Sequence, residues 1–187
     1  MKLAWVGLAL ILSACGTERA TGGESAVVPT PKIIGTPTPV KRTPTRPPAT
    51  CPASGRSIQV SEVEPALGHR SVAVTLTNCR ADDMAVEGYP EIVVLDGERR
   101  PMKITVSRGS SYLATDPGPG KIRLKQGKSV EAFVSWSNTT TDGEVRNATF
   151  LSIARGKQEG PVVWPVELDL GTTGAVKLTA WHQRTRS

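Results

Sequence analysis

Short segments in which apolar and polar residues alternate recur along the chain from Ile58 onward. Val72, Val74 and Leu76 are separated by small or polar residues, and residues 130–136 repeat the pattern. A period of two places every second side chain on the same face, as in a strand with one buried side. No segment has a sustained helical period. The pattern predicts eight or nine short strands, at residues 58–60, 72–77, 91–95, 104–106, 122–124, 130–136, 149–153, 162–166 and 176–181.

Turn-forming residues separate these predicted strands. Asp96-Gly97 is a strong hairpin signal directly after residues 91–95, and Lys125-Gln126-Gly127 predicts another tight turn before residue 130. Many short strands with frequent turns in one region are typical of a β-sandwich. We therefore predict an all-β fold, an antiparallel β-sandwich, for residues 51–187. The near absence of a helical pattern argues against an α/β enzyme.

The N-terminus predicts export and anchoring. An uncharged apolar run, Leu3–Leu12, follows Lys2 and is shorter than the roughly 20 residues that a membrane-spanning helix needs. The run ends in Leu12-Ser13-Ala14-Cys15, which resembles the lipobox of bacterial lipoproteins. The resemblance implies that residues 1–14 are a cleaved signal peptide and that Cys15 carries a lipid at the outer face of the cell membrane. The alternative is an ordinary signal peptide with a cysteine there by chance.

Residues 15–50 are rich in Pro and Thr and contain repeated Thr-Pro pairs, such as Thr36-Pro37 and Thr38-Pro39. Proline at this density removes backbone hydrogen-bond donors and favours extended conformations. We therefore predict a tether without a core of its own. Its expected reach lies between about 30 Å as a loose coil and about 110 Å when extended.

The chain carries 23 Lys+Arg against 17 Asp+Glu, but residues 51–187 contain 17 of the basic and 15 of the acidic residues. The predicted domain is therefore nearly balanced in charge. It has no basic stripe with interleaved aromatic residues, so we expect no nucleic-acid partner. The expected partners are the membrane, through the lipid on Cys15, and an envelope protein or an anionic wall polymer. We expect the protein to be a monomer.

Two cysteines, Cys51 and Cys79, remain once Cys15 is assigned to the lipid. An even pair in an exported domain predicts a disulfide. A metal site is the weaker alternative, because the cysteine spacing does not suit zinc and only His69 and His182 could add ligands. We expect no metal and no cofactor.

The polar residues offer no convincing catalytic site. Ser110 and Ser111 would need His69 or His182 as a base, and no nucleophile motif surrounds them. Two carboxylate pairs are also weak candidates. Glu62 and Glu64 would lie on one face of a strand, roughly 7 Å apart, and the neighbours Asp82 and Asp83 point apart in an extended segment and suit a solvated turn.

The aromatic residues are more informative. Trp136 continues the apolar face of its predicted strand, whereas Trp164 and Trp181 lie either in the core or on a partly exposed binding surface. In Gly88-Tyr89-Pro90, the glycine can adopt a positive φ and the proline fixes its own φ, which predicts a corner between strands. Tyr89 is then expected to bury its ring while its hydroxyl contacts the backbone.

An ordered series of motifs runs along the predicted domain: Val74-Thr75-Leu76-Thr77-Asn78-Cys79, Val86-Glu87-Gly88-Tyr89-Pro90, Val93-Val94-Leu95-Asp96, Leu124-Lys125-Gln126-Gly127-Lys128-Ser129 and Val134-Ser135-Trp136. This series resembles the secreted domain of unknown function 4232, which is common in actinobacterial lipoproteins. The resemblance spans roughly residues 51–181 and implies export and an immunoglobulin-like sandwich, with no established activity and no catalytic residues. The chain has no cysteine after Cys79, whereas many members carry further cysteines there.

The segment from Arg108 to Gly120 is longer than the two to five residues that a hairpin needs, and it is rich in Gly, Ser and Pro. Tyr112 and Leu113 lie at its middle. They are candidate interface anchors, because a few such residues usually dominate binding energy; a loop that only packs Tyr112 over the sheet edge is the alternative. We expect a non-enzymatic binding or accessory module, with an envelope-acting hydrolase or a structural partner of a membrane complex as alternatives.

Overall fold

The computed structural model describes residues 51–184, which form an all-β domain with twelve strands and no helix. The predicted signal peptide, Cys15 and the tether lie outside the described residues. The strands are β1 (Arg56–Val60), β2 (Glu64–Ala66), β3 (His69–Asn78), β4 (Met84–Glu87), β5 (Glu91–Leu95), β6 (Thr105–Arg108), β7 (Lys121–Leu124), β8 (Ser129–Ser137), β9 (Asn147–Ala154), β10 (Val162–Asp169), β11 (Ala175–Leu178) and β12 (His182–Gln183).

The nine predicted strands are present, and three short ones were not predicted. These are β2, β4 and β12, each of two to four residues. The strand predicted for residues 176–181 is divided, because β11 ends at Leu178 and the chain resumes pairing only at His182. Short strands of this kind carry too few alternating residues to give a period-two signal.

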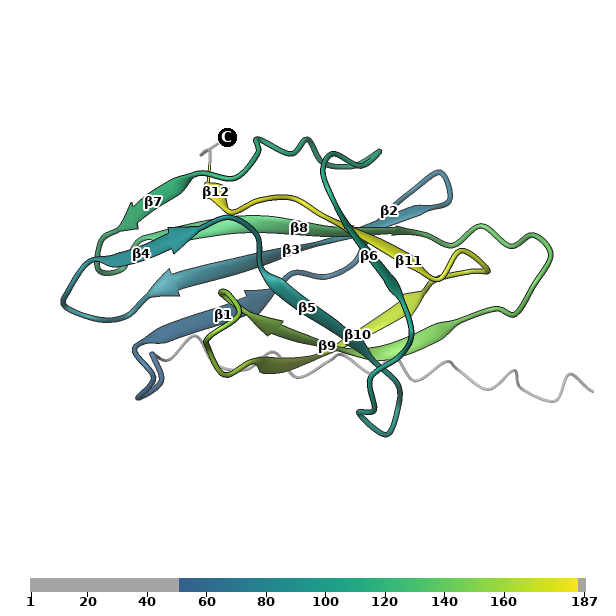
Figure 1. Ribbon diagram of the computed structural model, residues 1–187, viewed down its shortest axis with the longest axis horizontal. Helices are drawn as coiled ribbons and strands as arrows, with labels where there is room; N and C mark the ends of the chain where they lie inside the picture. Colours follow the sequence, from purple (N-terminus) through teal and green to yellow (C-terminus); the bar gives the residue numbers. More distant parts are fainter. Residues whose placement is uncertain (1–50, 185–187) are drawn as a thin grey trace, which may run out of the picture. The chain divides into compact units, whose positions relative to one another are not determined.

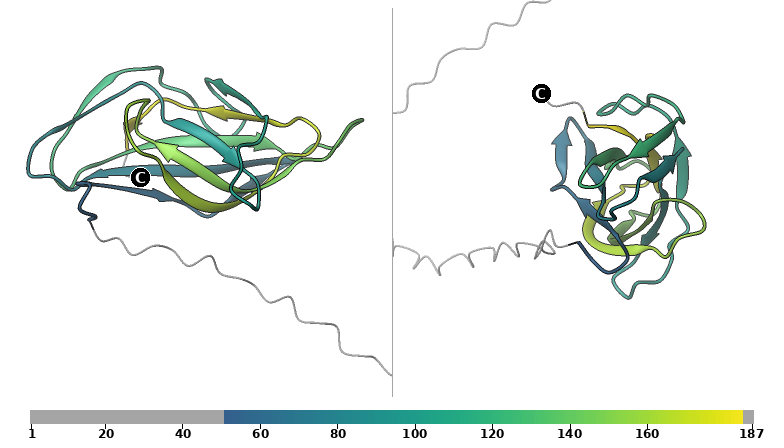
Figure 2. Two further views of the ribbon diagram at one scale, coloured as in Figure 1. Left: turned by 60° about the horizontal axis from the view of Figure 1, so that its bottom comes forward. Right: turned by 90° about the vertical axis from the view of Figure 1, so that its left-hand side faces the viewer.

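Ten of the twelve strands form two sheets that pack face to face (Figures 1 and 2). The larger sheet has the order β1-β3-β8-β11-β6, with β2 and β12 attached, and the smaller one has the order β10-β9-β5. Strands β4 and β7 form a separate ribbon. The centre of the larger sheet is the antiparallel pair β3–β8, in which Val72 lies opposite Val134. The prediction of an all-β sandwich is confirmed.

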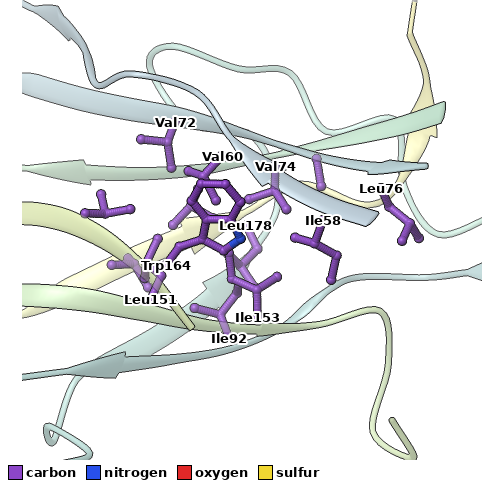
Figure 3. Close-up of a cluster of buried hydrophobic side chains, with 14 of the residues drawn as sticks. Ile58, Val60, Val72, Val74, Leu76, Ile92, Leu151, Ile153, Trp164 and Leu178 are labelled. Atoms are coloured by element: carbon purple, nitrogen blue, oxygen red, sulfur yellow. The ribbon is translucent and has the colours of Figure 1, made fainter. Parts of the chain in front are cut away.

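The core lies between the two sheets and follows the alternation read from the sequence. Figure 3 shows the Trp164 ring between Val60 and Val74 of the larger sheet and Leu151 and Ile153 of the smaller one. Each of these side chains is at most 7% exposed. Their opposite neighbours on each strand face outward, so the two outer faces are available to solvent or to other segments of the chain.

All three tryptophans of the domain are buried. Trp136, Trp164 and Trp181 are 4%, 5% and 1% exposed, so the alternative in which Trp164 and Trp181 form a binding surface is wrong. The Trp136 indole donates a hydrogen bond to Asp169 (2.9 Å) and the Trp181 indole donates to the Arg155 carbonyl (3.1 Å). The buried Trp164 Nε1 has no hydrogen-bond partner within residues 51–184.

The segment after β5 departs from the predicted hairpin. A turn does form, because Asp96 Oδ1 accepts hydrogen bonds from the Glu98 and Arg100 amides (2.9 and 2.8 Å). The positive φ falls on Arg99 (62°) and not on Gly97. After one bridge back to Leu95, the chain leaves the smaller sheet. Strand β6 then joins the larger sheet and pairs with β11 in parallel, the one pairing among the described strands that is not antiparallel.

The predicted disulfide between Cys51 and Cys79 is present, with a Cα–Cα distance of 5.6 Å. It joins the first described residue to the end of β3, and the Cys79 amide also donates to the Gly55 carbonyl (3.0 Å). Nearby, Arg56 and Arg155 both form ion pairs with Glu159. The start of the domain is therefore held by a covalent link and by charged contacts to the β9–β10 connection.

Candidate functional site

The segment between β6 and β7 crosses the outer face of the larger sheet, along the top of the view in Figure 1. Ser111 fixes it there. Its hydroxyl donates a hydrogen bond to Ser135 Oγ (2.9 Å) of β8 and accepts hydrogen bonds from the Leu113 and Ala114 amides (3.2 and 3.0 Å). Because the segment lies over it, Ser135 is only 4% exposed although it points away from the core.

Tyr112 stands on this anchored segment and stacks on His69, the first residue of β3. The two ring centroids are 4.7 Å apart and the planes are inclined by 17°. The side chain is nevertheless 64% exposed, whereas Leu113 beside it is half-buried. The imidazole supports the phenol ring, so the ring is held in place while much of its surface remains open to solvent.

A hollow of about 260 Å³ opens beside Tyr112 on this outer face. Both residues of the predicted loop line it, together with residues of β3, β8 and β11. The sheet register explains the rest of its lining: Lys177 of β11 lies opposite Ser135 of β8 on one side and Ser107 of β6 on the other. Side chains directly across such pairs are close neighbours. The residues that matter most below are His69, Ser107, Tyr112, Leu113, Thr173 and Lys177.

Asp116 ties the far end of the segment to two other parts of the chain. Its Oδ1 accepts hydrogen bonds from the amides of Ala180 (2.8 Å) and Gly118 (3.2 Å), and its Oδ2 accepts one from the Tyr89 hydroxyl (2.7 Å). Partial burial raises the pKa of the Asp116 carboxyl, but the three hydrogen bonds and the nearby His182 outweigh burial, and the pKa lies below its usual value. The ionised carboxylate of Asp116 therefore accepts the hydrogen bonds that fix this end of the segment.

The corner at Gly88-Tyr89-Pro90 forms as predicted, but Tyr89 differs from the prediction in two ways, since its ring is only half-buried and its hydroxyl has another partner. Gly88 has a φ of 73° and its carbonyl accepts a hydrogen bond from the Trp181 amide (2.8 Å). The sequence predicts that the Tyr89 hydroxyl contacts the backbone, but the hydroxyl donates a hydrogen bond to the Asp116 carboxylate. This hydrogen bond raises the pKa of Tyr89, and the Arg108 guanidinium lies 4.8 Å from the ring centroid. Tyr89 therefore joins the corner to the loop.

The other candidates for chemistry are not assembled into a catalytic arrangement. Ser110 Oγ accepts a hydrogen bond from the Asp116 amide. The Ser111 hydroxyl is already hydrogen-bonded to Ser135 and to the Leu113 and Ala114 amides. His69 and His182 stack on Tyr112 and on Phe133 respectively, and within residues 51–184 no serine–histidine hydrogen bond is found.

Neither of the two candidate carboxylate pairs forms a shared catalytic or metal site. Glu64 begins β2 while Glu62 lies before it, so the two do not share a strand. Asp82 and Asp83 form ion pairs with Arg80 and Arg123. Within the described part of the chain there is no cluster of three or more possible metal ligands, and no helix is long and apolar enough to cross a membrane.

A second hollow, of about 490 Å³, lies near Arg70 and Asp169. Its charged groups largely neutralise each other: the Arg70 guanidinium lies 3.4 Å from the Asp169 carboxylate, which also accepts a hydrogen bond from Asn138 (3.0 Å). This polar cluster closes one end of the core around the Trp136 indole. We therefore regard the hollow beside Tyr112 as the candidate site.

The sequence indicated Tyr112 and Leu113 but missed Ser107, Thr173 and Lys177. Lys177 occupies an outward position in a predicted strand, which marks it only as solvent-facing. Its place beside Ser107 depends on the parallel β6–β11 pairing, for which the sequence carries no local signal.

The comparison with known families matches residues 51–182 to the family described as Domain of unknown function (DUF4232). The chain belongs to this family, and the match covers nearly all of the described domain. No curated protein and no solved structure matches the chain.

Proposed function

We propose that this protein is a lipid-anchored binding module displayed on the outer side of a cell membrane. The observation that carries the binding part is the hollow beside Tyr112, where a long loop is fixed to the outer face of a rigid sheet and still leaves an aromatic ring 64% exposed. An exposed aromatic ring on an anchored loop is available to a partner, and aromatic residues are enriched in interfaces. Binding residues on loops held by a rigid scaffold are a common arrangement.

The proposed location rests on the N-terminal sequence and on the disulfide. The lipobox-like residues ending at Cys15 and the Pro/Thr-rich segment 15–50 suit a module held at a distance from its membrane. The Cys51–Cys79 bridge agrees with an oxidising compartment outside the cytoplasm. The resemblance to lipoproteins of actinobacteria supports the same location.

The anchor is tested by Cys15→Ser. We expect the variant to leave the membrane fraction and appear in the medium, or to accumulate unprocessed, because the thiol that carries the lipid is absent. Mature Cys15→Ser protein that still sediments with membranes would contradict the anchor.

The binding site is tested with a photoreactive amino acid. p-Benzoylphenylalanine in place of Leu113 is expected to crosslink to an envelope component in whole cells. The matched control places it at Val163, an outward residue of the smaller sheet that is 38% exposed. Equal crosslinking at both positions, or none at Leu113, would contradict a site in the hollow.

An envelope-acting hydrolase is the less supported alternative, because the Ser111 hydroxyl is committed to Ser135 and to two amides. A structural partner of a membrane complex remains the other alternative. It would appear in the crosslinking experiment as one protein captured in constant ratio through the Leu113 position.

A further inference from the structure

Two hydroxyl groups that line the hollow beside Tyr112, those of Ser107 and Thr173, already donate hydrogen bonds to the backbone. The Ser107 hydroxyl donates to the Val176 carbonyl (3.4 Å) and the Thr173 hydroxyl donates to the Leu170 carbonyl (3.0 Å). A hydroxyl has one hydrogen and two acceptor lone pairs. Since both hydrogens are directed into the protein, the lone pairs of Ser107 and Thr173 are left for a ligand. Such acceptors select groups that donate hydrogen bonds.

Lys177 adds a positive charge to the same hollow. It lies next to Ser107 across the β6–β11 pair and is exposed. Within residues 51–184 its ammonium forms no ion pair, and the described residues that line the hollow include no carboxylate. An ammonium group without an ion-pair partner, in a hollow lined by no acidic side chain, attracts an anionic group such as a carboxylate or a phosphate.

The third element is the stacked pair of Tyr112 and His69. Because His69 supports the phenol ring, the orientation of this flat apolar surface is set before a ligand arrives. A fixed aromatic surface reduces the ordering cost of binding. The electron-rich ring face attracts the weakly positive C–H groups on one face of a sugar ring.

From these three elements we infer that the hollow binds an acidic saccharide. One pyranose ring stacks on Tyr112, its hydroxyls donate hydrogen bonds to Ser107 and Thr173, and its carboxylate or phosphate contacts Lys177. The volume of about 260 Å³ suits one ring of a longer glycan, since it lies below the usual range of whole-ligand pockets. The inference rests on the proposed binding function and specifies its ligand class.

Calorimetric titration with two pairs of probes tests this inference. Tetragalacturonate is compared with its fully methyl-esterified form, in which each carboxylate is replaced by a neutral ester, and glucose 6-phosphate is compared with glucose. The first pair tests a carboxylate and the second a phosphate. We expect the charged member of at least one pair to bind about tenfold or more tightly than its neutral counterpart, the effect of one charge-assisted hydrogen bond.

Three variants identify the contacts. Tyr112→Ala is expected to weaken binding about three- to tenfold, the effect of one lost aromatic contact, while Tyr112→Phe keeps the ring and the affinity. Lys177→Gln is expected to remove the preference for the charged probe. Lys157→Gln, an exposed lysine that does not line the hollow, is the matched control. Thermal denaturation verifies that each variant is folded.

Several results would overturn the inference: no binding of either charged probe, equal binding of charged and neutral probes, or unchanged affinity in Tyr112→Ala and Lys177→Gln. If the saccharides fail while the photoreactive residue at position 113 captures a protein, the ligand class is wrong and the proposed binding function stands. If both experiments fail, the proposed function fails as well.

Discussion

The β2–β3 turn offers a direct test of how the backbone sets stability in this domain. Leu67 and Gly68 form the two-residue connection between Ala66 and His69, with φ values of 45° and 80°. Two successive positive φ values are those of a type I′ turn, in which Asn-Gly is the favoured sequence. Leucine is a poor residue for this conformation, because its Cβ approaches the following carbonyl oxygen. We expect Leu67→Asn to stabilise the domain.

The magnitude follows from two terms. Relief of the left-handed strain contributes about 1 kcal/mol, since asparagine tolerates this region. The loss of apolar burial is small: Leu67 is 87% exposed, so only about an eighth of the side chain is removed from water, worth about 0.3 kcal/mol. The net gain is about 0.5–1 kcal/mol, or roughly 2–4 °C in Tm for a domain of this size.

Urea denaturation of the wild type and of Leu67→Asn measures this gain as a higher midpoint with an unchanged slope. Val145→Asn is the matched control, because Val145 is also exposed (49%) but has a negative φ. It is expected to change the stability by less than about 0.5 kcal/mol. A midpoint for Leu67→Asn that is unchanged or lower would refute the strain argument.

Three further predictions concern other parts of the domain. Replacing Cys51 and Cys79 with serine is expected to lower the free energy of unfolding by about 3.5 kcal/mol, because their sequence separation of 28 defines a long closed loop; a loss below about 1 kcal/mol in urea denaturation would contradict this. Trp164→Phe is expected to cost about 1–2 kcal/mol less than Trp136→Phe, because only Trp136 loses an indole hydrogen bond; equal costs in the same assay would argue against it. The pKa of the Asp116 carboxyl lies below that of an unfolded aspartate, which is about 3.9. The ionised carboxylate therefore stabilises the fold above a pH of about 3.9, and this stabilisation is lost as the pH falls through the lower pKa of the folded state. Acid denaturation that is identical in the wild type and in Asp116→Asn would exclude this contribution.

The sequence was sufficient to predict the sandwich because its long strands each bury one complete face. The strands β3 and β8 are ten and nine residues long, and apolar residues alternate with small or polar ones through most of each. The disulfide could be predicted because an even pair of cysteines after a predicted signal peptide favours a bridge. Both features can be predicted from a single sequence, because the first depends on the local alternation of apolar residues and the second on the number of cysteines.

The site was only partly predictable, because its residues come together through pairings that no local pattern encodes. Tyr112 and Leu113 were indicated by the length of their loop. The sequence does not indicate Lys177, because its place in the site depends on the parallel β6–β11 register. It does not indicate Asp116 either, because the role of Asp116 depends on hydrogen bonds from Tyr89 and Ala180. The Asp96-Gly97 signal was locally correct as a turn, but sheet packing after Pro101 directed the following strand into the other layer.

The parallel pairing also determines when the candidate site can form. A chain that is synthesised from its N-terminus presents β6 about 70 residues before β11, the only strand among the described residues that pairs with β6. The far end of the loop after β6 also requires Ala180, because the Ala180 amide donates a hydrogen bond to the Asp116 carboxylate. Most of the core can assemble earlier, together with the contacts of Ser111 to β8 and of Tyr112 to His69, but the far end of the loop is fixed only when Ala180 has arrived. A chain truncated before residue 175 would lack Ala175, Val176 and Lys177, which line the hollow, so that only complete chains acquire the surface that we propose to bind.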